Sequence, residues 1–147
     1  MYDILLLTHS WWRWLVVAAA VFMLVRIAGS LFGKKEWNAL DQKSLSWFAI
    51  SLDIQLLLGL VLYIVSPLMQ SAMGDMGAAM RDSNLRFFAV EHVTVMLLAV
   101  IVAHVGVIQV KKAPVASKAM RAAIWMGVAV LMIAWAIPWA MRPLFRI

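Results

Sequence analysis

The chain contains no cysteine, few charged residues and only three histidines. Without cysteine it has no disulfide, no thiolate-held iron–sulfur cluster, no thiol nucleophile and no covalent haem attachment of the c type. Charged residues make up 14% of the 147 residues and hydrophobic residues 65%, whereas soluble domains are roughly half apolar. The composition therefore predicts an integral membrane protein, folded as a single domain over residues 1–147.

Four apolar segments are each long enough to cross a bilayer, which takes about 20 residues in a helix. They cover residues 5–32, 45–65, 87–110 and 122–141. Polar loops separate them, and the segments contain no long polar interruption. The sequence therefore predicts an all-α membrane protein, an up-down-up-down bundle of four transmembrane helices.

The segment between the second and third spans is too polar to cross a bilayer. Its methionines recur at helical spacing, at Met69, Met73, Met76 and Met80. This stripe predicts a short amphipathic helix over 69–82, lying on the outer membrane surface. Thioethers also suit Cu(I), so a copper site stays open beside simple membrane contact.

Basic residues are concentrated in two of the loops. The loops after the first and third spans contain Lys34, Lys35, Lys43, Lys111, Lys112, Lys118 and Arg121. The loop after the second span has Arg81 and Arg86, and the C-terminus has Arg142 and Arg146. The positive-inside rule then predicts a bacterial inner-membrane protein with both termini outside. The net charge of +6 reflects this topology and contact with anionic lipid, and does not indicate nucleic-acid binding.

Ionisable residues inside a span are costly and rare, so each is a candidate for function. Four of the candidates lie near the outer ends of the first and third spans: His9, Arg13, Glu91 and His92. These two spans are diagonal in a simple four-helix bundle, and bundle cofactors bind between facing helices. We therefore expect His9 and His92 to be the axial ligands of one haem b. Arg13 and Arg86 would meet its propionates, while Glu91 or a backbone carbonyl would fix the tautomer of a ligand.

Small residues strengthen this expectation. Ala99, Ala103 and Gly106 share the helical face of His92 and predict space beneath it for a porphyrin. Other interpretations stay open. His9 could be an interfacial residue and His92 a bundle histidine bonded to a neighbour, the two could bind a metal ion, or Arg13 could pair with Glu91.

Three further polar residues lie toward the inner face: Arg26, Asp53 and His104. Each is seven to nine residues from its cytoplasmic loop, or ~10–13 Å deep. We expect the three to lie within mutual hydrogen-bonding reach, because an unpaired charge at this depth is costly. The cluster is either a proton relay or quinone-head site, or a structural set that neutralises its own charge. His104 is twelve residues from His92, so the two cannot share a metal ion.

Four stretches resemble small bacterial four-helix membrane proteins labelled cytochrome b. They are HSWWRW at 9–14, QLLLGLVLYIVSP at 55–67, RFFAVEH at 86–92 and AIPW at 136–139. The chain is also broadly similar to four-helix cytochromes of the b561 type, which hold two haems with four histidines. Three histidines allow one haem by bis-histidine ligation. The resemblance implies a haem b protein of respiratory or quinone-linked electron transfer, alone or as an accessory subunit of a larger complex.

Two other classes of function remain. One is a structural or assembly subunit without a cofactor, and the other a small copper- or proton-handling transporter. The expected partners are the lipid bilayer, a quinone and other membrane subunits. The sequence has no Ser–His–Asp set at one depth, no H-E-x-x-H motif and no glycine-rich phosphate loop. Hydrolytic activity is therefore not predicted, and whether the chain is an enzyme stays open.

Overall fold

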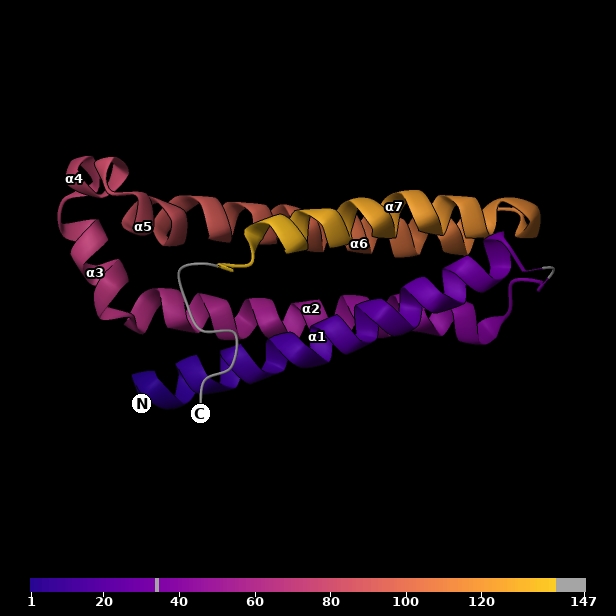
Figure 1. Cartoon of the computed structure of the whole chain (residues 1–147), viewed down its shortest axis with the longest axis horizontal. Helices are drawn as coiled ribbons and strands as arrows, with labels where there is room; N and C mark the ends of the chain where they lie inside the picture. Colours follow the sequence, from indigo (N-terminus) through magenta and orange to yellow (C-terminus); the bar gives the residue numbers. More distant parts are fainter. Residues whose placement is uncertain (34, 140–147) are drawn as a thin grey trace.

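The computed structural model describes residues 1–33 and 35–139, which form four long helices and several short ones (Figure 1). The long helices are α1 (Tyr2–Leu31), α2 (Ala39–Val65), α6 (His92–Lys112) and α7 (Val115–Ala136). Each is long and apolar enough to span a membrane, α6 as part of a continuous span over Ser83–Lys112. The all-α bundle of four transmembrane helices is confirmed, and the chain is a multi-pass membrane protein.

α1 begins three residues earlier than predicted, and two other helices begin earlier still. α2 begins at Ala39, six residues before the predicted start at 45, because Asn38 and Asp41 form a capping box. The Asn38 side chain accepts from the Leu40 and Asp41 amides, and the Asp41 carboxylate accepts from the Asn38 amide. α7 begins at Val115, directly after Pro114, seven residues before the predicted start at 122.

The end of α7 also differs from the prediction of 141. The helix ends at Ala136 and Ile137 is extended, because Pro138 excludes helical geometry from the residue before it. Residues 140 and 141 lie outside the described part of the chain. So do Lys34, Arg142 and Arg146, on which the predicted orientation partly depends.

The bundle consists of two helical hairpins. α1 packs along α2 and α6 along α7, while α2–α6 and α1–α7 contacts join the hairpins. α1 and α6 are therefore diagonal, as predicted. The Trp12 indole donates to the Ser51 carbonyl at 3.0 Å and fastens α1 to α2. At Gly106, α6 lies so close to α7 that a Cβ would be 2.7 Å from the Cβ of Trp125.

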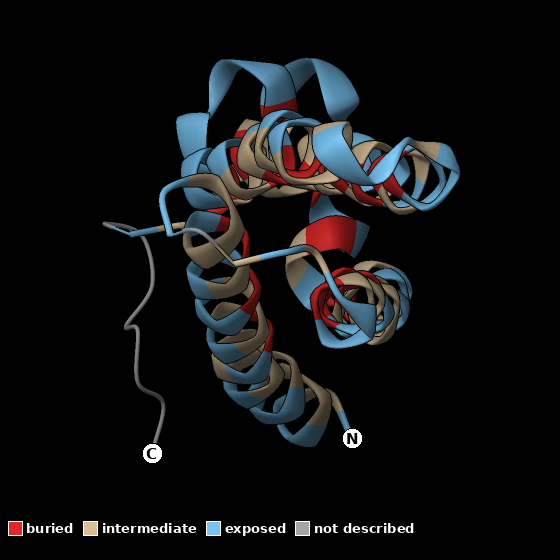
Figure 2. Cartoon of the chain, turned by 90° about the vertical axis from the view of Figure 1, so that its right-hand side faces the viewer, coloured by how far each residue is buried: buried red, intermediate tan, exposed pale blue. Residues whose placement is uncertain are grey.

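The core fills only one half of the bundle, the half nearer the loops after α1 and α6. Buried side chains of all four long helices meet there, and buried faces point inward while outer faces are exposed (Figure 2). The cluster comprises Val16, Met23, Ile27, Leu45, Phe48, Leu52, Ala103, Val110, Ala122, Met126 and Ala129. The other half of the bundle, which we call the α3 end, is less completely filled.

Short helices cover the α3 end: α3 (Pro67–Gly74), α4 (Met76–Arg81) and α5 (Ser83–Arg86). The prediction of one helix over 69–82 is wrong, because Asp75 breaks the segment and caps α4 by accepting from the Ala78 amide at 2.9 Å. The methionine stripe is divided accordingly. Met69 is buried in a small cluster with Ala72 and Ala79, whereas Met73, Met76 and Met80 are exposed.

Candidate functional site

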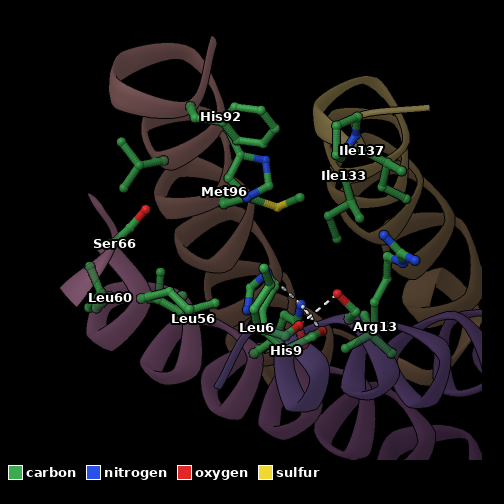
Figure 3. Close-up of a pocket in the computed structure, with 18 of the residues that line it drawn as sticks. Leu6, His9, Arg13, Leu56, Leu60, Ser66, His92, Met96, Ile133 and Ile137 are labelled. Carbon is green, nitrogen blue, oxygen red and sulfur yellow. Dashed lines mark hydrogen bonds between the residues drawn. The ribbon is translucent and has the colours of Figure 1, made fainter. Parts of the chain in front are cut away.

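A cavity lies between the two hairpins at the α3 end (Figure 3). Its volume is about 170 Å³, which is smaller than the roughly 300–1,000 Å³ that ligand pockets commonly enclose. Its lining is of the usual kind for such pockets, with apolar groups and a few polar ones. All four long helices line this cavity, mainly with leucine, isoleucine, valine and methionine. The polar groups include His9, Arg13, Gln55 and His92, so two of the predicted ligands face one space.

His92 follows a π-helical segment, Phe87–Glu91, in which the His92 amide donates to the Phe87 carbonyl five residues earlier. Such segments contain one extra residue per turn and frequently occur at functional sites. The His92 ring lies beside those of Phe87 and Phe88, with centroids 5.8 and 6.3 Å away. Packing therefore fixes the plane of the imidazole.

A backbone carbonyl fixes the tautomer of His92. The Nδ1 atom lies 2.8 Å from the Ala136 carbonyl, in the last turn of α7. A carbonyl oxygen only accepts, so Nδ1 carries the proton and the Nε2 of a neutral ring keeps its lone pair. Of the two groups that the sequence suggests for fixing a tautomer, a backbone carbonyl contacts His92, whereas Glu91 accepts from Arg86 instead.

His9 faces the cavity from the opposite side, on α1 (Figure 3). The Gln55 amide nitrogen lies 3.1 Å from His9 Nε2 and donates to the His9 carbonyl, also at 3.1 Å. This nitrogen has two protons, so it donates to both and makes Nε2 the acceptor. The His9 Nδ1 is buried without a hydrogen-bond partner within the described residues. One strong hydrogen-bonding atom of this ring is therefore unused.

Gly59 makes room for the His9 ring. A Cβ at position 59 would lie 3.2 Å from His9 Cε1, closer than nearly all such contacts in proteins. Gln55 and Gly59 are four residues apart on α2, so one helical face orients and accommodates His9. Neither residue is among those that the sequence predicts for a site. The available signal is a glutamine one turn before a glycine, within an otherwise aliphatic run.

The arginines divide between the cavity and its surroundings. Arg13 lines the cavity one turn after His9, with its guanidinium carbon 5.6 Å from the centre of the Trp14 ring. Arg86 instead donates to Glu91 at 2.7 Å and to the Met80 carbonyl at 3.3 Å. In the described part of the chain, neither Arg86 nor Glu91 lines the cavity. Their predicted places beside a propionate and a ligand are therefore wrong, as is an Arg13–Glu91 pair.

The small residues of α6 do not leave space beneath His92. Ala99 and Ala103 are fully buried, and Gly106 is in close contact with Trp125 and Met126 of α7. His92 itself bonds to α7, so the face it shares with these residues is the one that packs against that helix. The cavity borders the neighbouring face of α6, through Val93, Met96 and Val100. The prediction of a porphyrin space along the small residues is wrong.

The predicted inner cluster is two separate pairs. Arg26 Nε donates to the Asp41 carboxylate at 2.7 Å, and Lys35 Nζ to the same oxygen at 2.6 Å. Arg26 also donates to the Asn38 side chain at 3.2 Å. Because α2 begins earlier, Asp41 lies in its first turn at the level of Arg26. Asp53 lies about three turns further along the helix, deeper in the membrane. Asp53 therefore does not pair with Arg26.

Asp53 pairs with His104, as predicted for these two residues. His104 Nε2 lies 2.8 Å from Asp53 Oδ1, across the contact between α2 and α6. The two side chains are 47% and 40% exposed, so the pair lies on the outside of the bundle. Neither lines the cavity, within the part of the chain that the structure describes.

The cavity residues fit a haem in two respects. Two imidazoles face one space from diagonal helices, and His92 keeps a lone pair on the nitrogen that is not bonded to Ala136. A porphyrin supplies four nitrogens itself and needs only two protein ligands. Two features require adjustment. The Gln55 amide engages His9 Nε2, and the cavity of about 170 Å³ must widen between the two hairpins to admit a porphyrin.

Comparison with known proteins adds no assignment: no model of a protein family, no curated protein and no solved structure matches the chain.

Proposed function

We propose that the chain is a haem b-binding membrane protein, with His9 and His92 as the axial ligands of one haem in the cavity. The observation that carries the proposal is that His9 and His92, on diagonal helices, face each other across one largely apolar cavity. The Ala136 carbonyl holds His92 in a single tautomer. An imidazole that binds a metal usually donates from its other nitrogen to a carbonyl, a carboxylate or water.

The chain's own residues would hold and adjust the group. His92 offers Nε2, oriented by the Ala136 carbonyl and by two phenylalanine rings. His9 offers Nε2 in place of its contact with Gln55, whose amide keeps its bond to the His9 carbonyl. Arg13 supplies a positive charge for a propionate, and the aliphatic lining lowers the local dielectric constant.

When bound, such a haem supplies reversible one-electron transfer. The chain would then act in respiratory or quinone-linked electron transfer, alone or as an accessory subunit of a membrane complex. The proposal includes the resemblance of the chain to four-helix membrane proteins labelled cytochrome b. A cofactor-free assembly role is the alternative, because His92 is already bonded to a neighbouring helix.

The wild-type protein tests the proposal directly. Purified from cells with an ample haem supply, it should contain one haem per chain and show a reduced-minus-oxidised spectrum of the b type. Acid–acetone extraction should remove all of the haem, because the chain has no cysteine for covalent attachment. A colourless protein without stoichiometric haem would overturn the proposal.

We place the chain in a bacterial inner membrane, with the α3 end and both termini outside, on the distribution of lysine in the loops. The natural absence of cysteine makes single-cysteine variants informative. Ala116→Cys, exposed at the start of α7, should react with a membrane-impermeant maleimide only after cells are permeabilised. Ala78→Cys, exposed on α4, is the matched control and should react in sealed cells. The opposite labelling would reverse the orientation.

A further inference from the structure

The Asp53–His104 pair lies well inside two spanning helices. Asp53 is one residue from the midpoint of α2, Leu52, and His104 is eight residues before the inner end of the span over Ser83–Lys112. Ionisable groups at this depth are costly unless they face protein or a water-filled space. This pair does neither, since both side chains are close to half exposed on the outer face of α2 and α6.

The pair is also incompletely satisfied. One hydrogen bond joins His104 Nε2 to Asp53 Oδ1. Within the described residues, His104 Nδ1 and Asp53 Oδ2 have no hydrogen-bond partner. In water both atoms would be hydrated, but the hydrocarbon of a bilayer contains no hydrogen-bond donor or acceptor for them. In a net-neutral pair Nδ1 is a donor and Oδ2 an acceptor, whichever residue holds the proton between Nε2 and Oδ1, so the pair exposes one donor and one acceptor.

We propose that this face of α2 and α6 is the interface of a two-fold symmetric dimer, whose occupant is a second copy of the chain. An exposed donor beside an exposed acceptor is complementary to itself. A two-fold axis along the membrane normal keeps every residue at its own depth, so two such pairs meet at one level. His104 of each copy then donates from Nδ1 to the partner's Asp53, and four groups form a closed, neutral ring.

The surroundings of the pair suit such a contact. One turn away on α2, Leu57 is 63% exposed, and one turn away on α6, Ile108 is 50% exposed. The central polar groups are thus flanked by apolar side chains. Lipid solvates these apolar groups as well as protein does, so polar contacts in the middle of the face would hold the two copies together.

The oligomeric state in mild detergent tests the proposal. Wild type should have the protein mass of two 16.5 kDa chains by light scattering corrected for detergent. The double variant Asp53→Leu/His104→Leu should have half that mass, because the hydrogen bonds between copies are lost. Its haem content should equal that of the wild type, since neither residue lines the cavity. Failure of the dimer and failure of haem binding are therefore distinguishable.

Cross-linking in membranes gives an independent test that does not depend on the folding of the double variant. In the cysteine-free background, Leu57→Cys and Ile108→Cys, each made singly, should give a disulfide-linked dimer on oxidation, because the two-fold axis brings each residue level with the same residue of the second copy. Val25→Cys and Leu131→Cys, each made singly and 64% and 71% exposed on α1 and α7, are the matched controls and should stay monomeric. A monomeric wild type, a double variant that remains dimeric, equal cross-linking of the controls, or a different protein cross-linked to this face would each overturn the proposal.

Discussion

Purified His92→Ala protein is expected to contain no haem. With His9 of α1 as the remaining imidazole, the iron would have one axial ligand and the porphyrin would lose its attachment to α6. His9→Ala should lose the b-type spectrum as well. His104→Ala is the control with an unchanged spectrum, because His104 lies outside the cavity. The measurement is the reduced-minus-oxidised spectrum together with haem content per chain.

A second substitution separates ligation from packing. The amide of His92→Asn can donate to the Ala136 carbonyl much as Nδ1 does, but it offers iron no imidazole. This variant should keep the thermal stability of the apo-protein and still lack haem. Full wild-type haem in either His92 variant would rule out His92 as a ligand.

Asp41→Asn is expected to lower the free energy of unfolding by about 2–4 kcal/mol. The Asp41 side chain is fully buried and accepts from Arg26, Lys35 and the Asn38 amide. Breaking a buried ion pair from one side costs about 3–5 kcal/mol, and an exposed pair less than about 1. Arg26 and Lys35 are 21% and 35% exposed, which places the expected loss between these limits. Unfolding by heat or denaturant in detergent measures it.

Arg26→Gln in the same protein supplies the coupling test. The double variant Arg26→Gln/Asp41→Asn should recover part of the stability, because the arginine is no longer left without its anion. The asparagine oxygen still accepts from the Asn38 amide, so the cap of α2 is retained in both variants. Effects that simply add would mean that Arg26 and Asp41 are not energetically coupled.

The sequence predicts the fold because bilayer thickness and chain order determine most of it. Apolar segments of spanning length give four helices, and short connections place α1 and α6 on the diagonal. His9 and His92 meet in one cavity for the same reason, since both lie near the ends of their helices at similar depth. These inferences need residue counts along a helix, and no knowledge of its rotation.

Rotation and helix starts account for the errors. The cap formed by Asn38 and Asp41 lies in a polar stretch that the sequence predicts as a loop. The predicted start of α2 is therefore late, and Arg26 is predicted to pair with Asp53 although it pairs with Asp41. The small residues of α6 were assigned to the cavity, yet Gly106 packs on α7. Periodicity shows which residues share a face, but the direction of that face depends on side-chain packing between helices.

The bond between His92 and Ala136 links the end of α7 to whatever occupies the cavity. A ligand at His92 Nε2 favours the tautomer with its proton on Nδ1, which donates to the Ala136 carbonyl. In turn, an Ala136 carbonyl held in place favours this same tautomer, whose Nε2 can bind a ligand. Thermodynamic reciprocity requires the two effects to be equal in free energy. The position of the last turn of α7 would therefore be one determinant of the affinity of a ligand bound at Nε2. A partner protein bound to this end of α7 would change the ligand affinity of the cavity without contacting the cavity.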